Sequence, residues 1–354
     1  MVASKIRVLI VDDSALVRKV LVEILGSDPA IEIAGVANDP LDARDKIKAL
    51  NPDVLTLDVE MPKMDGVTFL SNLMRLRPMP VVMVSSLTEP GAEITLAALE
   101  LGAVDFVSKP KVDVAHGLET YAEELILKVK TAAKSRPRVS APAKPRELAK
   151  VGGGGASQIM ARISATDKLL AIGASTGGTE AVRELLAAMP PDGPPTVITQ
   201  HIHASFIKPL AARLDRNSAM RVTEATDGKQ IVPGHCYLAP GDSHLQVRRN
   251  GHQYICRLID GDRVNGHKPS VGVLFDSVAE QVGVNGLAVL LTGMGKDGAE
   301  AMKRVRDAGG TTIAQDEATS VVWGMPGAAV KIGAASEVLP LGQIAPRLVS
   351  LLSK

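Results

Sequence analysis

Residues 172–178 read Ile-Gly-Ala-Ser-Thr-Gly-Gly and lie between an apolar run at residues 169–172 and a helical pattern at residues 179–189. This order predicts a strand, a sharp turn and a helix. Glycines beside Ser175 let the backbone bend and direct helix N-terminal N–H groups at a developing oxyanion. The same pattern also suits an ordinary helix start or a phosphate-binding turn. Ser175 is therefore a candidate nucleophile whose role depends on partners elsewhere in the chain.

Length and composition indicate two domains, each with its own core. The chain has 354 residues, more than one ordinary domain needs, and a formal net charge of +1. A net charge so close to zero does not indicate electrostatic binding to nucleic acid or to a membrane surface. Cys236 and Cys256 show neither disulfide nor zinc spacing. The N-terminal residues resemble neither a signal peptide nor a membrane span. We therefore expect a reduced, cytoplasmic protein that does not insert into membranes.

Short apolar runs alternate with amphipathic helical patterns through the first 133 residues. Buried runs linked by helices favour a parallel, doubly wound α/β sheet built from five βα units. The carboxyl ends of its strands are the expected place for a site. The predicted strands are residues 8–11, 31–37, 54–57, 81–84 and 104–107, and the predicted helices are residues 15–25, 40–50, 66–76, 92–101 and 118–133.

A change of composition separates this half from a second α/β domain. Residues 134–166 are rich in proline, glycine and basic residues, which is typical of a flexible tether. The domains are accordingly residues 1–133 and 167–354. The second domain is predicted to hold a doubly wound, mostly parallel sheet with an antiparallel hairpin at residues 244–258. Its other predicted strands are residues 169–172, 197–199, 236–239, 287–291, 311–314 and 335–338.

Five polar residues follow strands of the first domain, where parallel strand ends meet at one edge. They are Asp12, Asp13, Asp58, Ser85 and Lys109. Three carboxylates at one rim repel one another unless a hard cation such as Mg²⁺ lies among them. Together these groups predict a phosphoryl-acceptor site with Asp58 as nucleophile and Lys109 offsetting charge on the transferred group. Any one of the acids could instead simply cap a helix.

These residues resemble bacterial response-regulator receiver domains, whose fold is flavodoxin-like. The resemblance covers roughly residues 4–130 and includes Met61-Pro62, Met64-Asp65-Gly66 and Lys109-Pro110. It implies that Asp58 is phosphorylated, that Asp13, Asp58 and the Glu60 carbonyl bind Mg²⁺ directly, and that Asp12 binds it through water. It also places Phe106 at the aromatic switch position. By pattern alone, Phe106 suits a core residue equally well.

A serine nucleophile needs a base, and the base needs an orienting acid. His201 follows the strand expected beside the one that leads to Ser175, and His203 is its nearest rival. Asp297 lies in a glycine-rich turn after a very apolar strand, whereas Asp316 follows a later strand and is the alternative acid. The other histidines lie in turns, in the hairpin or in the first domain, although His267 could instead bind substrate.

The order Ser175, His201, Asp297 differs from the order in α/β-hydrolases. The second domain instead resembles the catalytic domain of bacterial chemotaxis protein-glutamate methylesterases. The resemblance assigns nucleophile, base and acid to these three residues and places Thr176 and Met294 beside the reacting centre. It rests on six motifs in the same order: residues 172–178, 199–201, 238–245, 267–271, 291–298 and 315–318.

Two positions depart from that family. Ile202-His203 replaces the usual Met-Pro, and Gly272 replaces an Asp. Both are expected in the substrate cleft, where they bear on receptor preference and rate.

The resemblance implies an enzyme that removes methyl groups from glutamate γ-methyl esters of chemoreceptors and deamidates receptor glutamines. The first domain would inhibit it until a chemotaxis histidine kinase phosphorylates Asp58. Mg²⁺ would serve phosphorylation alone, no cofactor would serve ester hydrolysis, and we expect a monomer. The alternatives are an enzyme of a non-flagellar array, a serine peptidase, and a receiver with an inactive binding domain. A DNA-binding output is disfavoured because the second half has no basic recognition helix.

Overall fold

The computed structural model describes residues 4–62, 64–86, 88–109, 115–135 and 168–352. The chain divides into two compact units, Met1–Ala143 and Lys144–Lys354, and each is described by itself. The linker predicted at residues 134–166 lies outside the described residues from residue 136 onward, as does Pro110, so the exact bounds of the linker stay a prediction.

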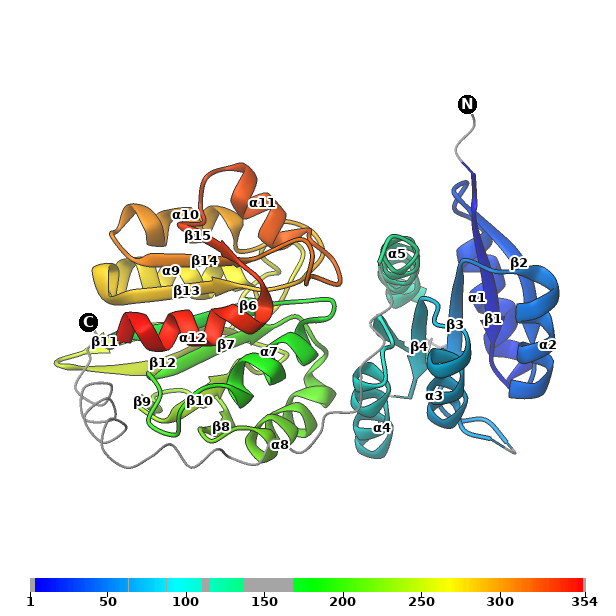
Figure 1. Cartoon of the computed structure of the whole chain (residues 1–354), viewed down its shortest axis with the longest axis horizontal. Helices are drawn as coiled ribbons and strands as arrows, with labels where there is room; N and C mark the ends of the chain where they lie inside the picture. Colours follow the sequence, from blue (N-terminus) through cyan, green and yellow to red (C-terminus); the bar gives the residue numbers. More distant parts are fainter. Residues whose placement is uncertain (1–3, 63, 87, 110–114, 136–167, 353–354) are drawn as a thin grey trace. The chain divides into compact units, whose positions relative to one another are not determined.

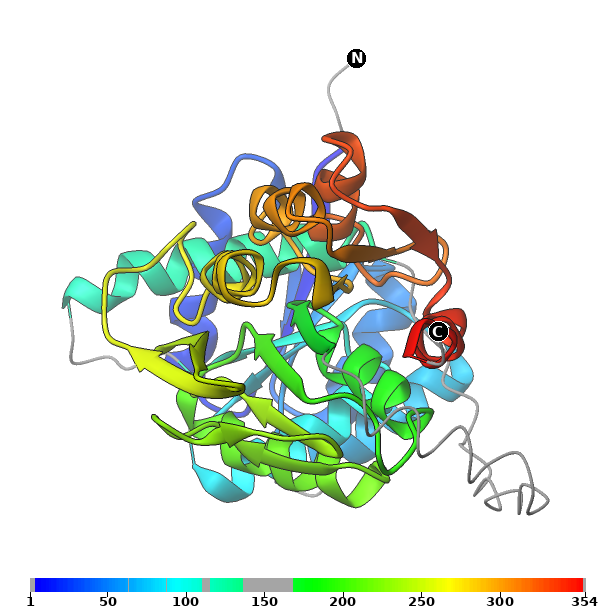
Figure 2. The same ribbon diagram turned by 90° about the vertical axis from the view of Figure 1, so that its left-hand side faces the viewer.

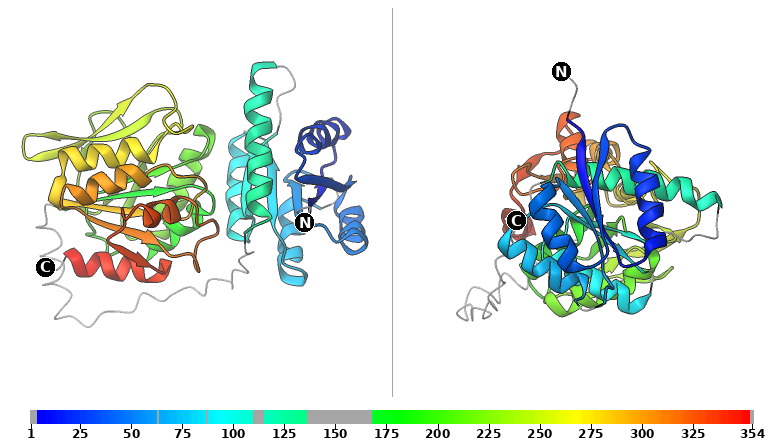
Figure 3. Two further views of the ribbon diagram at one scale, coloured as in Figure 1. Left: turned by 90° about the horizontal axis from the view of Figure 1, so that it is seen from above. Right: turned by 90° about the vertical axis from the view of Figure 1, so that its right-hand side faces the viewer.

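The N-terminal unit is a five-stranded parallel sheet in the order β2-β1-β3-β4-β5. Its strands are β1 (Ile6–Val11), β2 (Ile31–Ala37), β3 (Val54–Asp58), β4 (Val81–Ser85) and β5 (Asp105–Ser108). Its helices are α1 (Ala15–Gly26), α2 (Pro40–Leu50), α3 (Gly66–Leu76), α4 (Glu89–Glu100) and α5 (Ala115–Ala132). The helices lie on both faces of the sheet (Figure 3, right), so the prediction of five βα units is confirmed.

Local sequence sets where these helices begin. Ser14, Asp39 and Asp65 each precede a helix and accept hydrogen bonds from N–H groups of its first turn. Such side chains satisfy donors that the helix itself leaves unpaired. Strands β3 and β4 are fully buried and mostly apolar, whereas β2 at the sheet edge is largely half-buried. The turns at the strand ends are thereby held in place by the chain's own polar residues.

The C-terminal unit is built on a seven-stranded parallel sheet in the order β15-β14-β13-β6-β7-β10-β8. An antiparallel sheet, β11-β12-β9, accompanies it. The strands are β6 (Leu169–Ala174), β7 (Thr196–Gln200), β8 (Arg221–Glu224), β9 (Gln230–Ile231), β10 (His235–Leu238), β11 (His244–Asn250), β12 (Gln253–Ile259), β13 (Gly286–Leu290), β14 (Thr311–Gln315) and β15 (Glu337–Leu339).

Helices cover this larger sheet in two groups (Figures 1 and 2). Helices α7, α8 and α12 pack in one row, whereas α9, α10 and α11 pack in another. The chain leaves β6 toward β7 on one side and leaves β13 toward β14 on the other, so the strand order reverses between β6 and β13. The helices are α7 (Gly178–Ala187), α8 (Ile207–Asn217), α9 (Val271–Gln281), α10 (Ala299–Asp307), α11 (Met325–Lys331) and α12 (Leu341–Leu352), with 3₁₀ turns η1 (Ala204–Phe206) and η2 (Gly283–Asn285).

The sequence pattern predicted most of the strands of this unit. The mostly parallel sheet and the β11–β12 hairpin are confirmed. Two short strands were not predicted: β8, which alternates exposed and buried residues, and β9, which has two residues. Neither carries an apolar run long enough to be distinguished from a loop. Among the described residues, no helix combines the length and the apolar character that a membrane span needs.

Gly66 generates a test of the N-terminal unit. A Cβ at this position would lie 2.0 Å from the backbone oxygen of Asp58, whereas a Cβ at Gly26 would meet nothing within 4 Å. We expect Gly66→Ala to lower the free energy of unfolding of this unit by about 2–3 kcal/mol, because backbone must move to admit the methyl group. Urea denaturation followed by circular dichroism measures the loss. Gly26→Ala is the control, and equal stability of the two variants would contradict the close approach.

Candidate functional site

The three candidate residues of the C-terminal unit follow neighbouring parallel strands. Ser175 follows β6, His201 follows β7, and Asp297 lies in the loop after β13. Because the strand order reverses between β6 and β13, the connections leave the sheet in opposite directions there and open a crevice at the strand ends. The topology alone therefore brings together residues from three distant parts of the sequence.

Close backbone packing fixes the Ser175 turn at the start of α7. Gly177 has a φ of +73°, no side chain caps the helix, and the Gly178 N–H donates to the Ser175 carbonyl at 2.7 Å. The side-chain amide of Gln200 donates to the Ser175 carbonyl at 2.9 Å. Across the turn, a Cβ on Gly293 would lie 2.7 Å from the Ser175 Cβ. The half-buried Ser175 side chain is thus held against the Gly293 loop.

Asp297 is the most densely bonded carboxylate of this unit. Its side chain is 1% exposed, and its Oδ2 accepts from His201 Nε2 at 2.9 Å and from the Val271 N–H at 2.7 Å. Its Oδ1 accepts from Asn265 Nδ2 and Ser270 Oγ at 2.9 Å each, and from two further N–H groups, those of Gly272 and Gly298. Burial by itself would raise the pKa of Asp297, but the bonds from His201, Asn265 and Ser270 hold it well below its usual range.

His201 is oriented by two contacts. Its Nε2 bonds Asp297, and its ring stacks on His267 with centroids 3.8 Å apart and planes 11° apart. Its Nδ1 is buried and has no hydrogen-bond partner within the described residues. With Nε2 protonated toward the carboxylate, Nδ1 carries the lone pair. The imidazole can therefore accept a proton on the nitrogen that the carboxylate does not hold.

The structure separates the sequence-based alternatives. His203 bonds Ser205 and caps η1, and Asp316 accepts from Thr319 N and Oγ1 within its own turn. Within the described part of the chain, neither forms a hydrogen bond with His201 or Asp297. Thr176, which is buried, directly follows Ser175 in the sequence. Met294, which is half-buried, directly follows Gly293 in the facing loop.

Sequence reasoning missed the residues that hold the acid. Ser270 had a readable signal, because a serine before an apolar helical pattern predicts an N-cap, and it caps α9 while it bonds Asp297. Asn265 and Gln200 had none, since their partners lie 32 and 25 residues away in the sequence. His267 stacks on His201, and its possible contact with substrate stays a prediction.

The N-terminal unit gathers its acids in the same way. Asp12, Asp13 and Asp58 each offer an oxygen within 4.8 Å of the others. Lys109 Nζ lies 2.8 Å from Asp58 Oδ2 and 3.9 Å from Asp12 Oδ2. The buried Asp12 Oδ2 has no hydrogen-bond partner among the described residues. An unsatisfied carboxylate oxygen within an all-oxygen cluster fits a hard cation such as Mg²⁺.

Burial controls the charge of this cluster. It raises the pKa of Asp58 to about 6, against the opposing hydrogen bond from Lys109, and the nearby Asp12 charge adds to the rise. Burial also raises the pKa of Asp12. It acts to lower the pKa of Lys109, but the hydrogen bond and charge of Asp58 raise it overall. The carboxylates are costly to ionise together without added positive charge.

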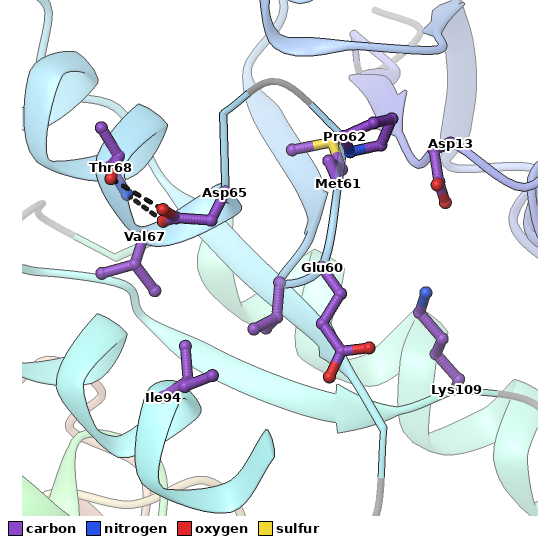
Figure 4. A pocket seen from close by; sticks show the side chains of 10 residues that line it. Asp13, Glu60, Met61, Pro62, Asp65, Val67, Thr68, Ile94 and Lys109 are labelled. Carbon is purple, nitrogen blue, oxygen red and sulfur yellow. Dashed lines mark hydrogen bonds between the residues drawn. The ribbon is translucent and has the colours of Figure 1, made fainter. Parts of the chain in front are cut away.

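Figure 4 shows the open pocket beside this cluster, with a volume of about 850 Å³. Asp13, Glu60 and Lys109 line its polar part, and Met61 and Ile94 belong to its apolar part. The Glu60 N–H donates to Asp58 Oδ1 at 3.1 Å. The pocket is therefore bounded by Asp13 and Lys109, two members of this cluster of charged residues.

Two further predicted receiver residues bond elements behind the pocket. Ser85 Oγ accepts from Thr95 Oγ1 of α4 at 2.6 Å and donates to the Gly91 carbonyl at 3.3 Å. Phe106 is buried, and Lys128 of α5 lies over its ring at 5.2 Å from the centroid. Ser85 is thus linked to α4 and Phe106 to α5.

Comparisons with known proteins agree with this division into two sites. The family model of the response regulator receiver domain matches residues 8–119, and that of the CheB methylesterase matches residues 170–348. The Thermotoga maritima CheB methylesterase catalytic domain, a crystal structure, is 39% identical with a TM-score of 0.51, over 52% of this chain and 98% of that one.

Curated relatives match along nearly the full length. A protein-glutamate methylesterase/protein-glutamine glutaminase of Xanthomonas campestris is 58% identical over 98% of this chain and 97% of its own. One of Hydrogenovibrio crunogenus is 54% identical over 99% of this chain and 100% of its own. The chain therefore belongs to the protein-glutamate methylesterase/protein-glutamine glutaminase family, enzymes in which a response regulator receiver domain is joined to a CheB methylesterase domain.

Proposed function

We propose that Ser175, His201 and Asp297 hydrolyse glutamate γ-methyl esters on chemoreceptors by way of an acyl-enzyme. The observation that carries this proposal is the orientation of His201. One ring nitrogen bonds a buried, ionised carboxylate. The other is buried and has no hydrogen-bond partner in the part of the chain that the structure describes, and β7, which His201 follows, pairs with β6, which leads to Ser175. An imidazole held in this way can take a proton from a serine hydroxyl.

Each residue has one role in the reaction. As the Ser175 oxygen bonds the ester carbon, its proton moves to His201 Nδ1, and Asp297 stabilises the imidazolium. N–H groups at the start of α7 stabilise the negative oxygen of the tetrahedral intermediate. His201 then returns the proton to methanol as the ester bond breaks. Water, deprotonated by the same imidazole, frees glutamate from Ser175.

The same steps account for deamidation. A receptor glutamine presents a γ-carbonyl in the same position, and ammonia leaves in place of methanol. Thr176 and Met294 flank the reacting serine and the Gly293 loop, where they would contact the substrate side chain. Ile202-His203 and Gly272 belong to the same rim and would influence receptor preference.

We further propose that phosphorylation of Asp58 by a chemotaxis histidine kinase controls this esterase. Asp13, Asp58 and the Glu60 carbonyl would hold Mg²⁺, with Asp12 bound through water. The bound cation would supply positive charge that offsets the charge of the transferred group. Lys109, 2.8 Å from Asp58, would stabilise the same oxygens, and Ser85 would leave its α4 partners to bond the phosphoryl group. In the unphosphorylated enzyme, the receiver would inhibit access to Ser175.

Ser175→Ala tests the esterase mechanism. We expect methanol release from methylated receptor membranes to fall by about 10⁴-fold or more, because the attacking oxygen is gone. Gas chromatography of released methanol measures it. Ser350→Ala, an exposed serine of α12, is the control. Equal rates for Ser175→Ala and wild type would remove the proposal, and serine-dependent cleavage of peptides without methanol release would favour a peptidase.

Asp58→Asn tests the buried acidic cluster. In the unfolded chain, an aspartate loses its proton near pH 3.9, whereas Asp58 keeps its proton up to about pH 6. The folded state therefore binds more protons between these values, and stability falls as pH rises through that window. In metal-free buffer near pH 7.5, we expect the free energy of unfolding of Asp58→Asn to exceed that of wild type by about 2 kcal/mol. Near pH 4.5 the difference between the two should be smaller.

Urea denaturation of the receiver at several pH values, with EDTA present, measures this gap. Added Mg²⁺ should stabilise wild type more than Asp58→Asn. A gap that stays constant from about pH 4.5 to about pH 7.5 would show that Asp58 titrates as in the unfolded chain.

A fragment that contains only residues 167–354 tests whether the receiver inhibits the esterase. This fragment should release methanol without a phosphodonor, and faster than the unphosphorylated full chain, because no receiver restricts access to Ser175. Acetyl phosphate and Mg²⁺ should accelerate the full chain and leave the fragment unchanged. A fragment no more active than the unphosphorylated full chain would contradict inhibition.

A further inference from the structure

The turn at residues 264–267 touches both Asp297 and His201. Val264 and His267 exchange backbone hydrogen bonds at 3.0 Å in each direction, which closes the turn. Asn265 within it donates its side-chain amide to Asp297 Oδ1 at 2.9 Å. His267, at its end, stacks on the His201 ring. A four-residue turn between β12 and α9 thus contacts two members of the proposed triad.

We propose that Asn265 is a positioning residue that holds the Asp297 carboxylate so that its Oδ2 faces His201. This inference rests on the proposed function, since it assigns a role within the same triad. Asn265 touches neither Ser175 nor the substrate in the proposed mechanism. It acts through Asp297.

The division of donors between the two carboxylate oxygens supports this role. Oδ1 accepts from Asn265, Ser270 and two backbone N–H groups, whereas Oδ2 accepts from His201 and Val271 N–H. Rotation of the carboxylate would break the set on Oδ1. Of all these donors besides His201, only Asn265 and Ser270 are side chains, and Ser270 also caps α9. Asn265 is therefore the donor whose loss leaves the α9 cap unaltered.

The backbone and the neighbouring glycine explain why asparagine fits here. Asn265 has a φ of +53°, a left-handed conformation that asparagine adopts more readily than most residues. A Cβ on Gly272 would lie 3.0 Å from Asp297 Oδ1 and 3.5 Å from Asn265 Nδ2. The glycine at this position leaves the Asn265 amide unobstructed beside the carboxylate.

Two substitutions separate positioning from mere turn formation. Asn265→Gly suits the left-handed backbone and removes the amide, whereas Asn265→Asp keeps the shape and replaces the donor with a second carboxylate. In the full chain we expect kcat for methanol release to fall about 10-fold in Asn265→Gly and further in Asn265→Asp, with KM within about twofold, because a bond to a charged group is lost away from the substrate.

Asn51→Gly is the matched control. Asn51 is the other left-handed residue that is not glycine among those described, with a φ of 47°, and it lies in the receiver at the end of α2. It should leave kcat unchanged. An Asn265→Gly enzyme with wild-type kcat, or one whose KM rises as much as kcat falls, would overturn the positioning role.

A measurement that needs no activity completes the test. The proton on His201 Nε2, hydrogen-bonded to a buried carboxylate, should give a low-field ¹H NMR resonance, assigned by its loss in His201→Gln. We expect both Asn265 variants to shift or broaden it and Asn51→Gly to leave it in place. An unchanged resonance in both Asn265 variants would overturn the inference even if the esterase proposal holds. If Ser175→Ala fails to stop methanol release, the resonance still decides the role of Asn265.

Discussion

The C-terminal site depends on the hydrogen bonds that surround the buried carboxylate of Asp297. A charge that is 1% exposed is costly unless donors surround it, and six donors do so. Those donors come from the loops before α9 and α10, from the first two residues of α9 and from His201. Satisfying one charge therefore brings together segments that are nearly 100 residues apart. The imidazole orientation follows from the same requirement.

The two units bring polar residues together by the same sheet topology. Each has a parallel sheet whose strand order reverses beside its first strand, between β1 and β3 in one and between β6 and β13 in the other. Polar residues at those strand ends meet because the connections diverge there. In the receiver the acids cluster around Lys109, and in the methylesterase domain one acid pairs with an imidazole. The same topology thus gathers three acids in one unit and an acid–imidazole pair in the other.

Sequence pattern predicted the parts of both sites that lie next to apolar runs. Asp58 and Ser175 were located because each adjoins a buried strand. His201 over His203 was favoured by its position directly after β7, and the hydrogen bond to Asp297 agrees with that choice. The strands β8 and β9 and the contacts of Gln200 and Asn265 were missed. Their signals are too short or depend on partners remote in the chain.

By itself, the sequence determined the two α/β units, the strand ends that carry the acids, the serine and the histidine, and the family resemblance. These follow from local periodicity and from motifs of adjacent residues. Only the tertiary structure decided which nitrogen of His201 bonds Asp297, that His267 stacks on His201, and that Asn265 donates to Asp297. Such contacts depend on loop conformations and on packing between elements that no local pattern encodes, because a buried carboxylate takes its donors from wherever the fold places them.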